Sequence, residues 1–249
     1  MRDFFDGVKL LGQGLKRVGT NPKRLFLGLI PAFLSLILFA ILLAVLLFFL
    51  GDLVGAATWY ARDWESGGLR ATVEVLTGAA ILGVAGFLAI LSYTAVTLAI
   101  GDPFYEAISE SIEDELGGVP DEVETPMWAS MLRSIRDSAR LILTTALLAI
   151  PLFLIGLIPV IGQVTGAVLG GLVGGWFLAV ELTGVAFYRR GLGLADRRRL
   201  LRTQRKTALG FGVAIFLCFL IPLGGVLMMP AAVAGGTLLT RKVFGLPTK

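Results

Sequence analysis

Two long stretches without a charged residue dominate the first half of the chain, at 25–50 and 75–101. A helix needs about 20 apolar residues to cross the hydrocarbon core of a bilayer, so each stretch is long enough to do so. We therefore predict transmembrane helices over 22–50 and 71–100, joined by the more polar interval 51–70.

The segments that flank these stretches are amphipathic or charged. Within 2–20, apolar side chains recur at helical spacing beside several cations, a pattern formed by Phe4, Val8, Leu11, Leu15 and Val18 with Lys9, Lys16 and Arg17. Such a pattern predicts a helix that lies on the cytoplasmic membrane surface. The charged segment 102–138 is predicted to be a cytoplasmic helical extension.

Two further apolar blocks, 140–188 and 206–241, are each interrupted by proline and glycine, in LIPVIGQV (157–164) and LIPLGGVL (220–227). Basic residues stand at both ends of each block, so each is predicted to return to the side where it began, as a helical hairpin. The second block leaves only about 12–16 residues per arm, too few to span. We expect it to be a re-entrant hairpin, with a tight turn at the far surface as the alternative for both.

The two interruptions supply candidates for a pore or gate. Irregular backbone at membrane depth is tolerated only where protein buries it or it lines a watery cavity, and helix N-termini there can hold anions. The candidates at the interruptions are Pro159, Gly162, Gln163, Pro222, Gly224 and Gly225. Glu181 joins them because a charge in an apolar run costs at least about 2.5 kcal/mol. It is interpreted either as a structural ion pair, with Arg189 as the candidate partner, or as a gate or proton-coupled site.

Composition agrees with the apolar pattern. Of 249 residues, 56% are hydrophobic and 16% are charged, and the mean hydropathy is +0.84. Soluble domains carry roughly a quarter charged residues. The sequence therefore predicts an all-α integral membrane protein. The absence of histidine excludes His-based catalytic triads and His metal sites, and the single cysteine excludes an internal disulfide.

The distribution of cations predicts the orientation in the membrane. If the N-terminus is cytoplasmic, 20 of the 22 Lys and Arg residues face the cytoplasm, and only the 51–70 loop lies outside. Positive charge is retained on the cytoplasmic side of bacterial membrane proteins. We therefore expect a multi-pass protein of the inner membrane with both termini inside.

Lys23 and Arg24 are the candidate anion-binding residues. They follow Asn21-Pro22, which suits the N-cap and first position of a helix. Two cations in a first turn oppose the helix dipole, and that cost makes sense if an anion lies there. The alternative is that they anchor the chain to lipid headgroups.

Charged stripes precede and follow residue 120. Acidic and basic residues repeat at helical spacing as Glu106, Glu110 and Glu113, and as Arg133, Arg136 and Arg140. They are predicted to form either a structural ion-pair network or a charged vestibule. The basic segment 189–206 is dense enough to bind anionic lipid, and its lack of interleaved aromatics argues against nucleic acid.

Four segments together resemble the CysZ-type sulfate permeases, which belong to the same superfamily as the etoposide-induced membrane protein. They are GDPFYEAISESIEDELGG (101–118), LIPVIGQV, RTQRKTALGFG (202–212) and IPLGGVLMMPAAVAGGT (221–237). The resemblance extends over about 5–240. It implies two long transmembrane helices, two membrane-inserted hairpins, a homo-oligomer, and passive uptake of sulfate.

The chain departs from the family pattern at two places. The family's Gly-Leu-Arg-Arg before the first long helix, where anion contact is placed, is replaced by Asn21-Pro22-Lys23-Arg24. Gly225 replaces an asparagine in the last hairpin.

Two functions remain open at this stage. The first is a permease or channel for sulfate or a related oxyanion. The second is a non-transporting membrane scaffold or lipid-associated protein with the same fold. No nucleophile–base pair or metal cluster is evident in the sequence, so we expect neither an enzyme nor a cofactor.

Overall fold

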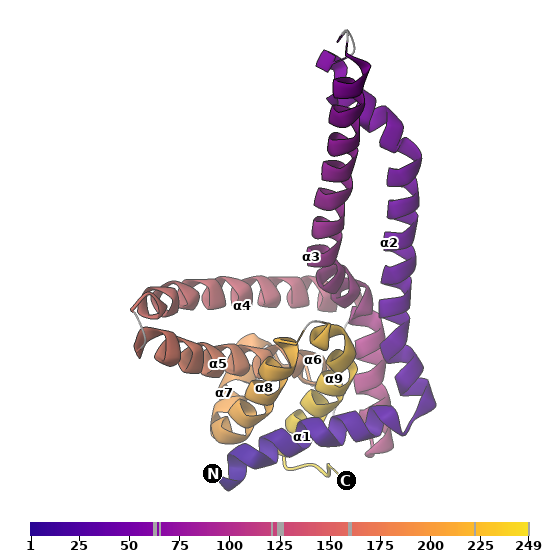
Figure 1. Ribbon diagram of the computed structural model, residues 1–249. Helices are drawn as coiled ribbons and strands as arrows, with labels where there is room; N and C mark the ends of the chain where they lie inside the picture. Colours follow the sequence, from indigo (N-terminus) through magenta and orange to yellow (C-terminus); the bar gives the residue numbers. More distant parts are fainter. Residues whose placement is uncertain are drawn as a thin grey trace. The chain divides into compact units, whose positions relative to one another are not determined.

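The structure, a computed structural model, describes residues 1–61, 64, 66–120, 122–123, 127–158, 161–221 and 223–248. For 127–135, 138 and 161 it describes the backbone only. Regular secondary structure within these ranges is entirely helical (Figure 1). The chain forms two compact units, Ile30–Asp102 and a larger unit made of Met1–Leu29 with Pro103–Lys249.

The smaller unit consists of parts of two long helices, α2 (Pro22–Ala57) and α3 (Gly67–Glu115), which run antiparallel. Near one end the Tyr93 hydroxyl donates to the Ala32 carbonyl at 3.0 Å, and its ring packs on Phe39. Near the other end Gly78 faces Val54. The short helix η1 (Trp59–Ala61) follows α2.

The predicted transmembrane ranges 22–50 and 71–100 lie inside α2 and α3. Both helices extend beyond the predicted ranges, α2 to Ala57 and α3 to Glu115. The α3 helix continues through Pro103 to Glu115, so 71–100 and the start of 102–138 form one helix. The next long helix, α4 (Met127–Gly156), begins within the predicted extension.

The larger unit is built around the last helix. Its remaining helices are α1 (Arg2–Gly19), α5 (Ile161–Leu182), α6 (Gly184–Tyr188), α7 (Leu194–Thr203), α8 (Arg205–Phe219) and α9 (Gly224–Val243). Most of α9 is buried, including the run from Pro230 to Arg241. The α4 helix packs on α5, α5 on α8, and α8 on α9.

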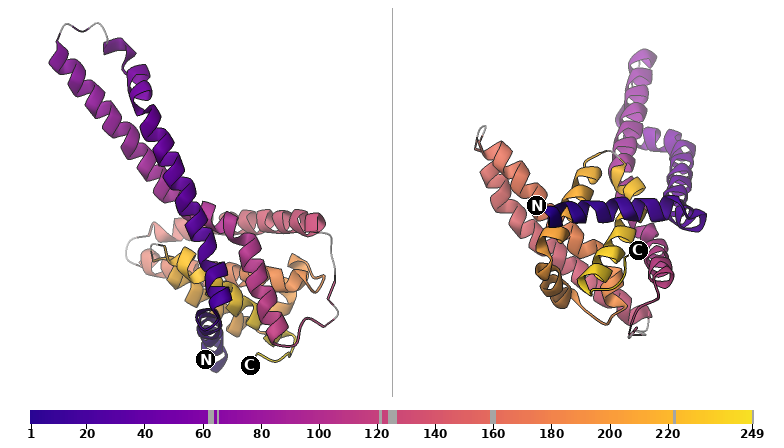
Figure 2. Two further views of the ribbon diagram at one scale, coloured as in Figure 1. Left: turned by 90° about the vertical axis from the view of Figure 1, so that its right-hand side faces the viewer. Right: turned by 90° about the horizontal axis from the view of Figure 1, so that it is seen from below.

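Helix α1 lies across α8 and α9 (Figure 2). Its buried face includes Leu10, Leu11 and two glycines at which the backbones approach closely. A Cβ atom at Gly7 would collide with α8, and one at Gly14 would collide with α9. Val8 and Leu15 of the predicted apolar stripe are exposed, whereas Leu11 and Val18 are buried.

Glycine also sits at the two helix–helix turns. A Cβ atom at Gly162 would collide with the Ile155 carbonyl oxygen at the end of α4. One at Gly224 would collide with the Cys218 carbonyl oxygen at the end of α8. Just before α9, Leu223 takes φ 61°, the left-handed region that side chains other than glycine rarely adopt. The glycines therefore allow tight reversals of the chain.

Four helical stretches in the described chain are long and apolar enough to span a membrane: Pro22–Ala57, Gly67–Glu115, Ala139–Gly156 and Gly162–Leu182. Most of their side chains are exposed. Long apolar helices that leave their surfaces uncovered are typical of proteins embedded in lipid. The prediction of an all-helical membrane protein is thus confirmed.

Candidate functional site: charged contacts at the end of α3

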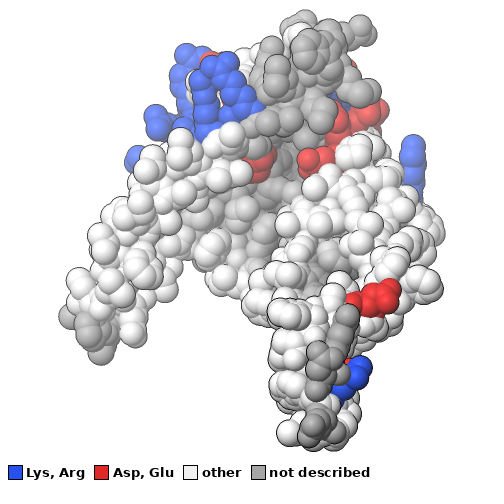
Figure 3. Space-filling view, turned by 90° about the horizontal axis from the view of Figure 1, so that it is seen from above, with Lys and Arg blue, Asp and Glu red and all other residues white. Residues whose placement is uncertain are grey.

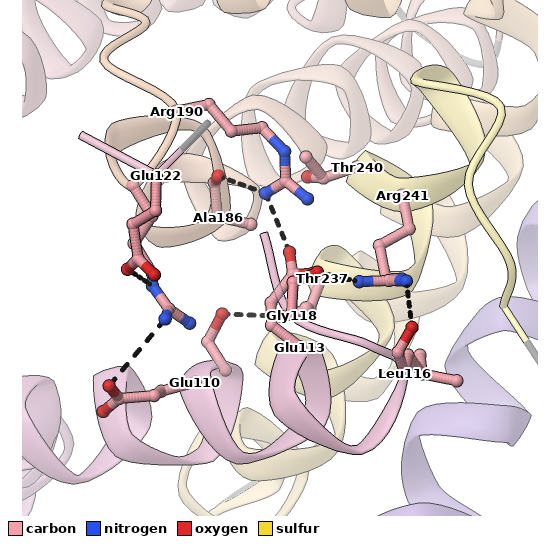
Figure 4. Close-up of polar contacts among 12 residues, drawn as sticks. Glu110, Glu113, Leu116, Gly118, Glu122, Ala186, Arg190, Thr237, Thr240 and Arg241 are labelled. Atoms are coloured by element: carbon pink, nitrogen blue, oxygen red, sulfur yellow. Dashed lines mark hydrogen bonds and ion pairs between the residues drawn. The ribbon is translucent and has the colours of Figure 1, made fainter. Parts of the chain in front are cut away.

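The last turns of α3 carry a fully buried carboxylate, Glu113, held between two arginines (Figure 4). Arg190, just after α6, donates to Glu113 Oε1 at 2.8 Å. Arg241, from α9, donates to Glu113 Oε2 at 2.5 Å. A buried carboxylate needs such compensation, because an unpaired charge in an apolar interior is strongly unfavourable.

Arg241 also satisfies the end of α3. Its guanidinium donates to the main-chain oxygens of Leu116 and Gly118, and its Nε donates to Pro247 O at 2.8 Å. The last carbonyls of a helix lack partners within the helix and carry partial negative charge, so a cation suits this position. Arg241 therefore joins α9, the end of α3 and the C-terminal segment.

Arg189 extends the network to the segment after α3. Its Nε donates to Glu122 at 2.8 Å, and its Nη2 lies 3.8 Å from Glu110. Burial acts to lower the pKa of this guanidinium, but the hydrogen bond and charge of Glu122, then the charge of Glu110, raise it above its ordinary value. Arg189 therefore links the segment after α6 to two carboxylates, Glu122 and Glu110.

A second group of contacts lies at the start of α2. The Asn21 side-chain oxygen accepts from the main-chain N–H of Lys23 at 3.1 Å and of Arg24 at 3.4 Å, which confirms the predicted N-cap. The buried Arg24 guanidinium donates to the Ser111 hydroxyl and carbonyl at 3.0 and 2.8 Å.

The same guanidinium pairs with Glu115 at 2.6 Å. Arg17 of α1 also pairs with Glu115, whose side chain is 46% exposed. One half-exposed carboxylate is thus shared by two largely buried guanidiniums, and a tetrahedral oxyanion has the charge and the oxygen atoms to take the place of that carboxylate.

The predicted site residues lie in different surroundings. Lys23 is exposed, and so is Gln163, whereas Gly162, Gly224 and Gly225 are buried. Pro159, Pro222 and the Arg133 side chain lie outside the described residues.

The residues of the two predicted charged stripes also differ in their surroundings. Glu106, Arg136 and Arg140 are exposed, and Glu110 and Glu113 contact Arg189 and Arg190. Glu181 is exposed at the end of α5, where its main-chain oxygen accepts from Arg197 at 3.4 Å.

Sequence reasoning missed the arginines that complete the network, namely Arg17, Arg190 and Arg241. The sequence alone places Arg189 and Arg190 in the basic segment 189–206, which is predicted to bind anionic lipid. One signal is present in the sequence. Two adjacent arginines, Arg189 and Arg190, have opposite charge to two acids three residues apart, Glu110 and Glu113, with which they pair in the structure. Only the ion pairs in the folded structure show that they meet.

These features define a class of protein. It is an all-helical integral membrane protein with buried ion pairs at one end of a long, mostly apolar helix. The chain belongs to the family described as Sulfate transporter CysZ/Etoposide-induced protein 2.4, whose model matches residues 10–230. The family resemblance drawn from the sequence is confirmed. The family carries a transporter's name, in agreement with the prediction that the chain is not an enzyme.

Several relatives carry the name Sulfate transporter CysZ. The protein of Pseudomonas aeruginosa is 32% identical over 236 residues, covering 93% of both chains. That of Pseudomonas fluorescens is 35% identical over 165 residues, covering 64% of this chain and 66% of the relative. That of Vibrio parahaemolyticus is 33% identical over 154 residues, covering 60% and 62%.

Proposed function

We propose that this protein moves sulfate passively across the bacterial inner membrane. The observation that carries the proposal is the similarity to a protein named as a sulfate transporter over 93% of both chains. A match of that extent covers most of the spanning helices and of the two hairpin regions. The structure adds a second argument, because two cations, Lys23 and Arg24, lie in the first turn of the long helix α2.

We place both termini in the cytoplasm, because nearly all the cations then lie on that side. In this orientation α1 lies at the inner membrane surface. The turn after α2 then reaches the outer surface, where the exposed aromatic residues Trp59, Tyr60 and Trp64 suit the interface between water and lipid.

The turns of the two hairpins differ from that aromatic turn. Exposed apolar side chains surround them, including Leu157 and Ile158 after α4, and Leu220, Ile221 and Leu223 after α8. Such side chains at a watery surface would be unfavourable. In addition, the 15 residues of α8 extend only about 22 Å, less than the hydrocarbon thickness of about 30 Å. These observations support re-entrant hairpins whose turns end in the apolar part of the bilayer.

Sulfate contact is assigned to the start of α2. Lys23 is exposed and attracts the anion, while Arg24 is held in place by the hydroxyl and carbonyl of Ser111. Sulfate takes the place of the Glu115 carboxylate beside Arg24, since both are oxyanions that a guanidinium binds through paired N–H groups. The breaks at Gly162 and Gly224, with Glu181, are assigned to the path or its gate. Following the family resemblance, we also propose a homo-oligomer.

Uptake of radiolabelled sulfate into liposomes that contain the purified protein tests this function. We expect uptake above that of empty liposomes, and a several-fold reduction in uptake at low sulfate for Lys23→Gln. Lys16→Gln is the matched control, since Lys16 is also an exposed cation and lies on α1. An equal effect of both variants would remove the assignment to Lys23. No uptake by folded wild-type protein would favour the non-transporting membrane scaffold instead.

A further inference from the structure

A groove between α4, α5, α7 and α8 combines an apolar wall with a basic rim. It has a volume of about 590 Å³. Its wall includes Leu148 of α4 with Leu172 and Trp176 of α5. Its rim is formed by Arg198 and Arg202 of α7 and Arg205 of α8. The groove lies apart from the contacts at the end of α3.

The rim arginines carry charge that the described part of the chain leaves uncompensated by any salt bridge. Two other arginines of the same segment do have partners. Arg199 pairs with Asp196, and Arg197 is buried with its guanidinium over the Tyr188 ring. Arg202 and Arg205 also line a polar pocket of about 350 Å³, together with two further cations, Lys206 and Lys242, and one acid, Asp3. Lys and Arg side chains gather in the same way on one edge of the face seen in Figure 3.

Arg198 is the most constrained of the three. Its guanidinium lies 5.8 Å from the centre of the Phe177 ring, and its Nη2 atom is buried without a hydrogen-bond acceptor among the described residues. Burial, and then the like charges of Arg197 and Arg202, lower the pKa of Arg198, while Asp137 opposes them. A buried guanidinium N–H without an acceptor is costly, and an external anion would relieve that cost.

We propose that this groove binds an anionic phospholipid, with the phosphate held by Arg198, Arg202 and Arg205 and an acyl chain against the apolar wall. Charge complementarity selects an anion. The wall selects a lipid over a free ion, because an inorganic oxyanion would leave the apolar surface uncovered. The arginines follow the membrane-inserted helix α5, where lipid headgroups begin, and basic pockets between membrane helices are suited to such headgroups. The site does not depend on sulfate transport.

Trp176 in the wall provides a direct probe. Replacing Trp59, Trp64 and Trp128 by Phe leaves Trp176 as the only tryptophan. Its fluorescence is measured in vesicles that contain brominated phosphatidylglycerol or brominated phosphatidylcholine at equal mole fraction, because bromine quenches tryptophan on contact. We expect enrichment of the anionic lipid at Trp176 on the order of fivefold for each arginine contact.

Matched variants locate the effect. Arg198→Gln/Arg202→Gln is expected to abolish the preference for phosphatidylglycerol and to keep the quenching by phosphatidylcholine. Arg199→Gln, which removes an exposed arginine of the same helix, is expected to keep the preference. A protein whose only tryptophan is Trp59 reports the general effect of membrane charge.

Several results would overturn the proposal. Equal quenching of Trp176 by both lipids in the protein with all its arginines would do so, without reliance on any rim variant. So would a preference no larger than that of Trp59, or one unchanged in Arg198→Gln/Arg202→Gln. Loss of the preference in sulfate but not in chloride of equal ionic strength would show a site for free oxyanions rather than lipid.

Discussion

Glu113 is a fully buried carboxylate whose two arginine partners lie 77 and 128 residues further along the chain. Replacing it by glutamine leaves Arg190 and Arg241 without their counter-charge. Removing one member of a buried ion pair costs about 3–5 kcal/mol. We therefore expect Glu113→Gln to lower the thermal unfolding midpoint in detergent clearly.

Glu110 on the same helix provides the matched control. It is 58% exposed and 3.8 Å from Arg189, and exposed ion pairs contribute only about 0–1 kcal/mol. Glu110→Gln is expected to leave the midpoint nearly unchanged. Equal midpoints for the two variants would show that Glu113 does not join the basic segments as described.

The periodicity of charge indicated that Glu106, Glu110 and Glu113 share one helix face, but local spacing cannot identify partners on distant elements. The structure brings Arg190 and Arg241 to Glu113 through the packing of α6 and α9. Similarly, the pattern Asn21-Pro22 predicted the start of α2 correctly, because capping depends on neighbouring residues alone. The contact of Arg24 with Ser111, 87 residues away, had no local signal.

At the scale of elements, glycine spacing determines how α1 packs. A Cβ atom at Gly14 would collide with the Ala231 carbonyl oxygen and lie 2.6 Å from the Gly235 nitrogen, both in α9. Gly14→Ala is therefore expected to cost about 1–3 kcal/mol through overpacking, measured as a lower unfolding midpoint in detergent.

Gly12 on the opposite face of α1 has open space at its Cβ position. Gly12→Ala is expected to be neutral or to stabilise the protein by up to about 1 kcal/mol, since alanine favours the helix. If Gly14→Ala were as stable as Gly12→Ala, α1 would not pack on α9 through this glycine.

The apolar runs in the sequence identified the helices that are long enough to span, because length and hydropathy are properties of the segment itself. The helix ends were less accessible to prediction. The predicted ranges 71–100 and 102–138 put a boundary near residue 101, but α3 continues to Glu115, where charged partners from other elements stabilise its last turns. The apolar stripe of α1 was only partly informative, because glycines rather than large residues form much of its buried face.

At the scale of the whole molecule, the charges and the exposed apolar surface separate. Large apolar side chains remain uncovered along the spanning helices, whereas the ion pairs of the larger unit gather at the end of α3 and its partners. In a membrane, lipid covers the first kind of surface, and the second kind lies on the side where we place the cytoplasm. The family relationship extends over residues 10–230 and so includes the spanning helices, Glu113 and Arg190, whereas Arg241 lies beyond the matched range.

The central claim is that this chain lets sulfate cross a membrane down its gradient. The most direct measurement is radiolabelled sulfate influx into liposomes with the purified protein, without ATP and without a proton or sodium gradient. The account predicts influx faster than into empty liposomes, which stops when the internal sulfate concentration equals the external one. Influx equal to that of empty liposomes, with folded protein verified in the membrane, would contradict the account, and accumulation only with an imposed ion gradient would contradict its passive mechanism.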